Sequence, residues 1–229
     1  NEIGGQLPLA SRPPGKQEID RFTSYLKNRV SRPGIQVELG KEIDKQWLEE
    51  VKPDVAILAT GSEPTIPDIN GLSKRNAITA REVLRGAHIQ GKEVVIIGGG
   101  QVGCEVGEFL SEQDKDVTII EVLDDIARDM PHISKLPLVM ALENNGVRVM
   151  TKTRVLSATE ESISLECKGN KELLQADVII VATGAEPRSE GIESVIKKKV
   201  PEVYVIGDKV KARGILEAVR EGYDIAKVI

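Results

Sequence analysis

The 229-residue sequence is poor in the side chains that build metal sites and disulfide frameworks, with only two histidines and two cysteines. No group of them has the spacing of zinc ligands, so we expect no metal. Cys104 and Cys167 lie in different predicted elements and form no C-x-x-C pair, which favours a reducing compartment over a secreted disulfide scaffold. No apolar run approaches the roughly 20 residues of a membrane-spanning helix, and no signal peptide is visible. We therefore expect a cytoplasmic protein without a membrane partner.

An excess of positive charge is also missing, since the formal net charge is -5. This balance argues against nucleic acid as a main partner. Charged residues make up 29% of the chain and apolar residues 40%, a composition typical of a globular protein, and the length allows one large domain or two small ones. We expect small-molecule ligands, and the sequence leaves a homo-oligomer open.

The most informative stretch is EVVIIGGGQVGCEVGEFLSEQDKDVTIIE, from Glu93 to Glu121. Residues 94–97 are apolar and mostly β-branched, which predicts a buried parallel strand. Residues 101–113 carry apolar side chains at helical spacing, and residues 117–120 predict a second buried strand. The stretch therefore reads as strand, helix, strand, with a glycine-rich turn between the first two elements.

Gly98, Gly100 and Gly103 form a G-x-G-x-x-G motif in that turn. The first glycine allows the tight strand-to-helix turn, the second lets a diphosphate approach the backbone, and the third lets the helix pack closely on the strand. The helix N-terminus then holds the phosphates through its N–H groups and dipole. Because Glu121 also ends the second strand, we expect a dinucleotide site rather than a glycine-rich packing turn.

Glu121 also bears on which dinucleotide binds. A carboxylate at this strand end accepts hydrogen bonds from the ribose hydroxyls and repels a 2′-phosphate, whereas NADP sites place an arginine nearby. Residues 122–125 offer no basic group. We therefore predict NAD(H) rather than NADP(H).

Two similar phrases divide the chain, DVAILATGSEP at residues 54–64 and DVIIVATGAEP at residues 177–187. Each reads as a buried strand that ends in Ala-Thr-Gly, which indicates two related nucleotide-binding halves. The predicted fold class is α/β, in which a Rossmann-like domain with a parallel sheet and a small β-meander is inserted into a partial second Rossmann-like domain. The inserted domain spans residues 67–190, and the outer one residues 1–66 and 191–229.

Further helices and strands follow from periodicity and capping patterns. Helices are expected at 17–30, 79–85, 134–144 and 214–228, and strands at 35–39, 147–150, 155–158, 163–167 and 203–206.

At this point the sequence resembles a known family. NEIGGQLPLASRPPGKQEI, NAITAREVLRG, VVIIGGGQVGCEVGEFL, IARDM and VPEVYVIGDKVKARGILEAVREGYDIA are similar to the C-terminal region of NADH:flavin oxidoreductases related to 2,4-dienoyl-CoA reductase and trimethylamine dehydrogenase. The likeness covers essentially the whole chain. In such proteins an N-terminal barrel holds FMN and an iron–sulfur cluster, and the C-terminal region binds FAD and a nicotinamide nucleotide. The family's FAD diphosphate motif lies upstream of Gly4, so we expect an N-terminally truncated piece with an incomplete FAD site and a missing barrel partner.

The resemblance implies a role for residues at both nucleotide sites. Those expected at FAD are Gly5, Gln6, Leu7, Thr60, Gly61, Gly207, Asp208 and Ile215, with Asp208 as the acid that binds the ribitol chain. Those expected at NAD are Gly98, Gly100, Gln101, Val102, Gly103, Glu105, Glu121, Thr183 and Gly184, with Glu105 near the nicotinamide amide. A solvated helix glutamate remains an equal interpretation of Glu105, and strand termination an alternative for Thr60 and Thr183.

The predicted function is an NADH-to-flavin electron-input module of a larger enoate- or dienoyl-CoA-reductase-like oxidoreductase. Hydride transfer between nicotinamide and flavin needs no protein acid or base, so no catalytic residue is assigned. One alternative is a non-redox module that keeps ADP or FAD for structure alone. A disulfide reductase is disfavoured, because Gln6-Leu7-Pro8-Leu9 stands where that class carries a redox cysteine.

Overall fold

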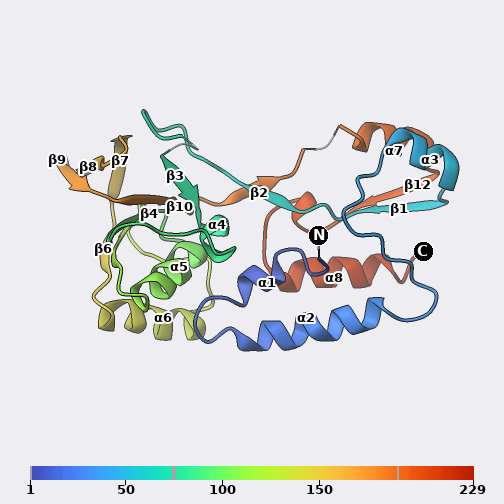
Figure 1. Cartoon of the computed structure of the whole chain (residues 1–229), viewed down its shortest axis with the longest axis horizontal. Coiled ribbons are helices and arrows are strands. Elements are labelled where there is room, and N and C mark those ends of the chain that lie inside the picture. Colours follow the sequence, from blue (N-terminus) through green and yellow to red (C-terminus); the bar gives the residue numbers. More distant parts are fainter. Residues whose placement is uncertain (1, 74–75, 190) are drawn as a thin grey trace. The chain divides into compact units, whose positions relative to one another are not determined.

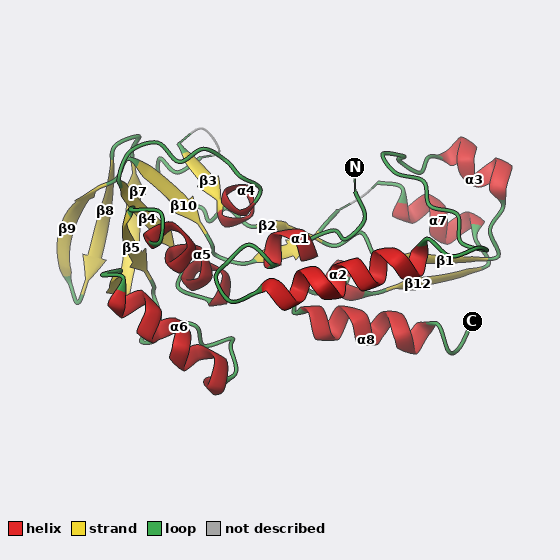
Figure 2. Cartoon of the chain, turned by 60° about the horizontal axis from the view of Figure 1, so that its bottom comes forward, coloured by secondary structure: helices red, strands yellow, loops and turns green. Residues whose placement is uncertain are grey.

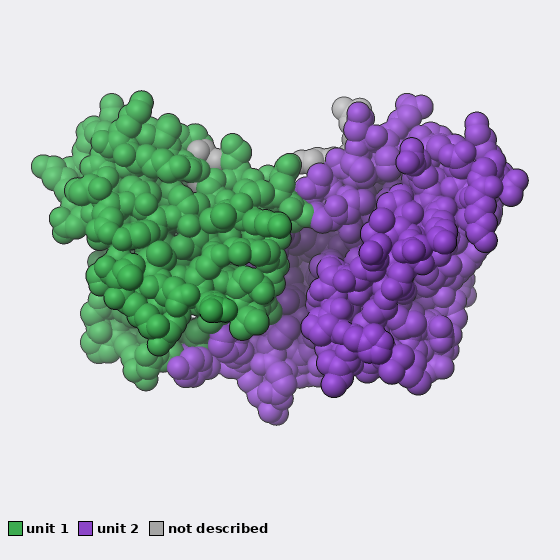
Figure 3. All heavy atoms as spheres, turned by 180° about the vertical axis from the view of Figure 1, so that it is seen from behind, with its two compact units in different colours: residues 1–5, 26–63, 185–229 green, residues 6–25, 64–184 purple. Residues whose placement is uncertain are grey.

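The computed structural model describes residues 2–73, 76–189 and 191–229; residues 1 and 190, which bound two predicted domain segments, lie outside them. The chain forms two compact units, coloured separately in Figure 3. Unit 1 comprises residues 1–5, 26–63 and 185–229, and unit 2 comprises residues 6–25 and 64–184. This division differs from the predicted one chiefly at residues 6–25, where an ion pair between Lys16 and Glu105 ties the segment to unit 2.

Unit 2 is built on a five-stranded sheet in which every pairing is parallel. The strand order is β3 (Ala77–Thr79), β10 (Val178–Val181), β4 (Glu93–Ile97), β5 (Asp116–Ile120) and β6 (Arg148–Met150). The inner strands consist almost wholly of valine and isoleucine, as expected for strands buried on both faces.

Successive side chains of the central strand point to opposite faces of this sheet. Val94 and Ile96 pack against α4 (Ala80–Leu84), α5 (Gln101–Ser111) and α6 (His132–Asn144). Val95 and Ile97 pack against an antiparallel meander of β7 (Thr153–Ala158), β8 (Ser162–Cys167) and β9 (Asn170–Gln175). Unit 2 is therefore a sheet with helices on one face and a β-meander on the other, as Figures 1 and 2 show.

Unit 1 contains a two-stranded parallel sheet of β1 (Val55–Leu58) and β12 (Glu202–Val205). α3 (Lys45–Val51) and α7 (Glu193–Lys199) cover it through a core of Leu48, Leu58, Ile196 and Val200. A 3-10 turn (Gly207–Lys209) leads from β12 to α8 (Ile215–Ile225). α1 (Leu7–Ala10) lies in unit 2, and α2 (Gln17–Val30) belongs partly to each unit. β2 (Ser62–Pro64) pairs with β11 (Ala185–Pro187), and both strands lie at the bounds between the two units along the chain.

The α/β class and most of the expected elements are confirmed. The strand predicted at residues 35–39 is wrong, because this segment pairs with no strand in the part of the chain that the structure describes and leaves Ile35 and Leu39 more than half exposed. Strand β9 was not predicted, since its sequence NKELLQ is polar and five of its six residues are exposed. Within the described residues, no helix combines the length and apolarity that crossing a membrane requires.

Candidate nucleotide-binding site

The glycine turn lies at the carboxyl edge of the unit 2 sheet, between strand ends from three parts of the sequence. Ile97 of β4 is in register with Ile120 of β5 on one side and Val181 of β10 on the other. In parallel α/β sheets, ligands bind in the crevice outside this edge. The topology therefore brings together the turn after β4, Glu121 after β5 and Thr183 after β10.

Close packing requires the first and third glycines of the motif. Gly98 has φ +106°, and a Cβ there would lie 2.5 Å from the carbonyl oxygen of Ala182. A Cβ on Gly103 would lie 2.0 Å from the carbonyl oxygen of Gly98. The start of α5 can thus approach the end of β4 only because both residues lack a side chain, as the dinucleotide fingerprint demands.

Glu121 is buried, with 9% of its surface exposed. Its two carboxylate oxygens accept backbone hydrogen bonds from Gly99 at 2.7 Å and Leu123 at 2.8 Å. Each oxygen has a second lone pair, so the carboxylate can also accept from a ribose hydroxyl. The two N–H donors fix it beside the glycine turn, where the sequence predicted it.

Asp129 also lies at the candidate site, although no local sequence pattern predicts it there. Its carboxylate accepts a hydrogen bond from the N–H of Gln101 at 2.8 Å and lies 3.4 Å from the position of a Cβ on Gly100. The loop that carries it is held to the turn by the N–H of Ala127, which donates to Gly99 O at 2.7 Å. Asp129 therefore caps α5 from a loop remote in sequence, which no local capping pattern reveals.

Glu105 lies one helical turn after Gln101 and is 7% exposed. Its carboxylate forms an ion pair with Lys16 at 2.7 Å and accepts a hydrogen bond from Gln101 Nε2 at 2.8 Å. A buried, paired carboxylate replaces the solvated helix glutamate that was one interpretation of this residue. Lys16 was missed, because nothing near it in sequence indicates a partner on α5.

The remaining predicted NAD residues occupy the same edge. The backbone N of Thr183 lies 3.2 Å from the position of a Cβ on Gly98, and its hydroxyl donates to Thr65 O at 2.9 Å. Gly184 has φ +99°. Val102, at the first turn of α5, is 49% exposed.

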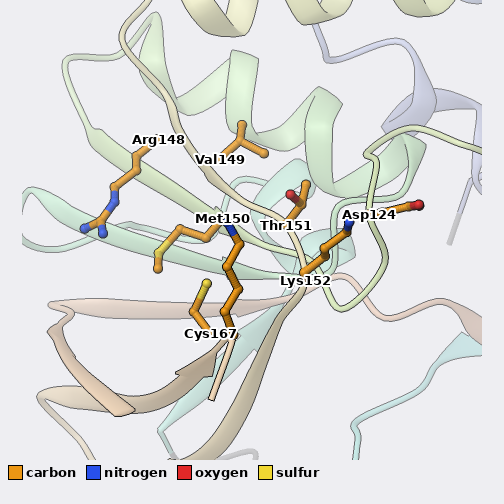
Figure 4. A pocket seen from close by; sticks show the side chains of 8 residues that line it. Asp124, Arg148, Val149, Met150, Thr151, Lys152 and Cys167 are labelled. Carbon is orange, nitrogen blue, oxygen red and sulfur yellow. The ribbon is translucent and has the colours of Figure 1, made fainter. Parts of the chain in front are cut away.

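A cavity of about 440 Å³ opens beside the end of β6. It is lined by Asp124, Arg148, Val149, Met150, Thr151, Lys152, Cys167 and Lys168, most of which Figure 4 shows. Its basic residues are Arg148 of β6, Lys152 between β6 and β7, and Lys168 in the β8–β9 turn, and none of them lies in residues 122–125.

In unit 1, the parallel pairing of β1 with β12 brings the first Ala-Thr-Gly turn close to the Gly-Asp turn. Leu58 is in register with Val205, so Thr60 and Gly61 lie near Gly207 and Asp208. One carboxylate oxygen of Asp208 accepts from the hydroxyl of Ser62 at 3.2 Å, and the other from the N–H of Arg213 at 3.1 Å. Asp208 is thereby positioned at the carboxyl edge of the small sheet.

Glu221 of α8 supports this turn and was not identified from the sequence. It accepts a hydrogen bond from the N–H of Gly207 at 2.6 Å and also pairs with the guanidinium of Arg213. The Gly207 amide and the Arg213 guanidinium lower the pKa of Glu221.

The N-terminal segment predicted to contact FAD is divided between the two units. Gly5 belongs to unit 1, whereas Gln6 and Leu7 belong to unit 2. Ile215 opens α8 in unit 1 with 37% of its surface exposed.

Cys104 and Cys167 are both free thiols. Burial raises the pKa of Cys104 to about 12, so this thiol stays protonated and unreactive at neutral pH. Among the described residues, no group of three or more His, Cys, Asp or Glu side chains could hold a metal ion.

The fold, the glycine turn and the acidic strand end define a dinucleotide-binding α/β protein. Residues 3–223 match the family "Pyridine nucleotide-disulphide oxidoreductase", and the chain belongs to this family.

The curated relatives that the chain matches are named as an oxidase and a reductase. The chain is 36% identical to an NADH oxidase of Thermoanaerobacter brockii over 98% of its length and 35% of the relative's. It is 33% identical to a bilirubin reductase of Mediterraneibacter gnavus over 99% of its length and 35% of the relative's. The chain therefore spans about a third of the curated relatives it matches.

Among solved structures, a 2-naphthoyl-CoA reductase in complex with 2-naphthoyl-CoA is similar to the whole chain. The TM-score is 0.94 at 27% identity, and the match covers 35% of that protein.

Proposed function

We propose that the chain is the NADH-to-flavin electron-input module of a flavin-dependent oxidoreductase. Unit 2 binds NAD(H), and unit 1 carries the flavin side. The observation that supports this most is the carboxylate of Glu121, held by the N–H groups of Gly99 and Leu123 at the end of β5. A fixed carboxylate here suits the two free hydroxyls of an NADH ribose and opposes a 2′-phosphate.

The diphosphate is assigned to the start of α5. The first N–H groups of a helix have no acceptor within it, and Asp129 takes the one from Gln101. The N–H groups of Val102 and Gly103 then serve the diphosphate, with the helix dipole adding attraction. Gly100 has no side chain, so its backbone is open to a ligand except where the Asp129 carboxylate lies, 3.4 Å from the position of a Cβ.

At the other end of the site, Glu105 and Lys16 are assigned to the nicotinamide amide. A carboxylate accepts from an amide NH₂, and the ammonium of Lys16, 2.7 Å from Glu105, holds that carboxylate in position. In unit 1, Asp208 is assigned to the ribitol hydroxyls of FAD. When bound, nicotinamide supplies a hydride and flavin accepts it; the protein orients both rings and excludes water.

The electrons are proposed to leave for a part of a longer chain that holds FMN and an iron–sulfur cluster in a barrel. Relatives about three times as long as the aligned region support a longer chain, and the barrel with its two cofactors is taken from the family resemblance. Bilirubin reductase, cinnamate reductase and 2-naphthoyl-CoA reductase are named for conjugated substrates, so we propose an unsaturated, conjugated compound as the final acceptor.

The test is anaerobic mixing of NADH with the full-length protein while the visible absorbance of its flavin is followed. We expect NADH to bleach the flavin, and Glu105→Gln to slow the bleaching with little effect on NADH affinity. NADH binding without any bleaching would instead support the alternative of a non-redox nucleotide-binding module.

A further inference from the structure

A basic segment lies next to Glu121, although it is remote in sequence. The N–H of Lys152 donates to Leu123 O at 2.8 Å, and the N–H of Leu123 donates to Glu121 Oε1 at 2.8 Å. The N–H of Thr153 donates to Glu121 O at 3.0 Å. The segment after β6 that carries Lys152 is therefore hydrogen-bonded to the segment after β5 that carries Glu121. One bond joins Thr153 to Glu121 itself, and another joins Lys152 to Leu123.

The cavity beside this segment carries more positive than negative charge. Arg148, Lys152 and Lys168 line it, against a single carboxylate from Asp124. Arg148 is partly neutralised by Glu172 at 3.1 Å, so the two lysines supply most of the free positive charge. In Figure 4 the side chain of Lys152 extends along the cavity toward the loop that carries Asp124.

The strand order relates this cavity to the nucleotide. β4, β5 and β6 are consecutive neighbours in the sheet. A dinucleotide with its diphosphate at the turn after β4 and its ribose at Glu121 after β5 continues toward β6. The cavity at the end of β6 is therefore next along the adenosine half of the ligand.

We propose that this cavity is a phosphate subsite beside the adenosine ribose, and that Glu121 alone keeps it closed to 2′-phosphorylated nucleotides. The inference rests on the proposed NAD(H) site. Lys152 and Lys168 then favour a 2′-phosphate, but in the native protein the repulsion by Glu121 outweighs their effect on nucleotide preference.

The charges explain why the native site still selects NADH. Glu121 is 9% exposed, so its repulsion of a phosphate at the ribose acts at short range with little screening by water. Lys152 and Lys168 are exposed, where solvent and salt weaken their attraction. Removing the buried negative charge leaves the lysines as the dominant charges near the 2′ position.

The test compares two probes of the adenosine half, ADP and adenosine 2′,5′-bisphosphate, by titration calorimetry. Wild type should prefer ADP. Glu121→Gln, which keeps an oxygen to accept one of the two backbone N–H bonds, should shift the preference toward the bisphosphate by about tenfold. Adding Lys152→Gln and Lys168→Gln should abolish most of that shift, whereas adding Lys92→Gln should not. Lys92 is the matched control, since it precedes β4 at the opposite edge of the sheet and pairs with Asp116.

A second measurement avoids any change at Glu121. In the wild-type background, Lys152→Gln with Lys168→Gln should weaken the bisphosphate several-fold and leave ADP unchanged. The subsite is refuted if Glu121→Gln folds without shifting the preference, or if the shift survives loss of both lysines. It is also refuted if the lysine pair has no effect in the wild-type background. Failure of wild type to bind either probe would overturn the proposed function itself.

Discussion

Individual residues at the glycine turn stabilise the fold, and they also form the proposed nucleotide site. Gly103 shows this most directly, because a Cβ there would meet Gly98 O at 2.0 Å, a backbone atom that cannot move away cheaply. Asp129 and Glu121 likewise satisfy backbone N–H groups while they place negative charge at defined points of the site.

Gly103→Ala should lower the free energy of unfolding by about 1–3 kcal/mol, because overpacking forces the helix away from the strand. NADH affinity should fall with it. Urea denaturation and calorimetry measure the two effects. Gly191→Ala is the matched control, since its Cβ meets nothing within 4 Å. Equal stability of the two variants would contradict the packing role.

Asp129→Ala should cost about 0.5–2 kcal/mol of stability, the usual cost of losing a helix cap. Asp129→Asn should cost much less, because its side-chain oxygen can still accept from the N–H of Gln101. Thermal unfolding of both variants tests this. The capping assignment fails if asparagine is as damaging as alanine.

The two thiols should react differently in the native protein. Cys104 is fully buried with a pKa raised to about 12 by desolvation, whereas Cys167 is partly exposed. Mass spectrometry after brief alkylation near neutral pH should show a label on Cys167 and none on Cys104. Labelling of Cys104 before unfolding would contradict the packing of α5.

At the scale of elements, sequence patterns predicted the features that depend on interactions between residues close together in sequence. The Thr79–Glu82 capping box is present with both of its hydrogen bonds, and the strand–turn–helix at Gly98 follows from steric rules that act within a few residues. The strand expected at residues 35–39 failed because a strand also needs a partner, which alternation in one segment cannot supply. The contacts of Lys16, Asp129 and Lys152 join segments far apart in sequence, so no local pattern could reveal them.

Lys16 couples the start of α2 to α5 through Glu105. Its side chain is 29% exposed and that of Glu105 10% exposed, so removing the ammonium leaves a nearly buried carboxylate without its cation. Lys16→Met should therefore cost about 1–3 kcal/mol of stability, less than the loss of a fully buried pair. Glu105→Gln in the Lys16→Met background should recover part of it. Chemical denaturation measures both, and additive effects of the two substitutions would contradict the coupling.

Across the whole molecule, several carboxylates are stabilised in their charged form. Lys197 and Lys209 lower the pKa of Glu193 to about 2, from an ordinary value of 4.5. Backbone N–H groups of Glu93 and Lys92 lower the pKa of Asp177, and the Gly207 N–H and the Arg213 guanidinium lower the pKa of Glu221. Each group binds protons less readily when folded, so its contribution is complete above its unfolded pKa and is lost as pH falls through its folded pKa.

The melting temperature should thus be steady above about pH 5 and fall progressively toward pH 2. Differential scanning calorimetry over this range gives the profile. Glu193→Gln combined with Glu221→Gln should flatten part of the decline. An unchanged acid profile in the double variant would show that other groups control acid stability.

The central claim is that unit 2 binds NADH selectively through the glycine turn and Glu121. Its most direct test is titration calorimetry of the chain with NADH and with NADPH at the same ionic strength. NADH should bind at least about tenfold more tightly, a difference of about 1.4 kcal/mol, and Glu121→Ala should remove most of that preference. Equal affinities, or tighter binding of NADPH by the wild-type chain, would contradict the claim.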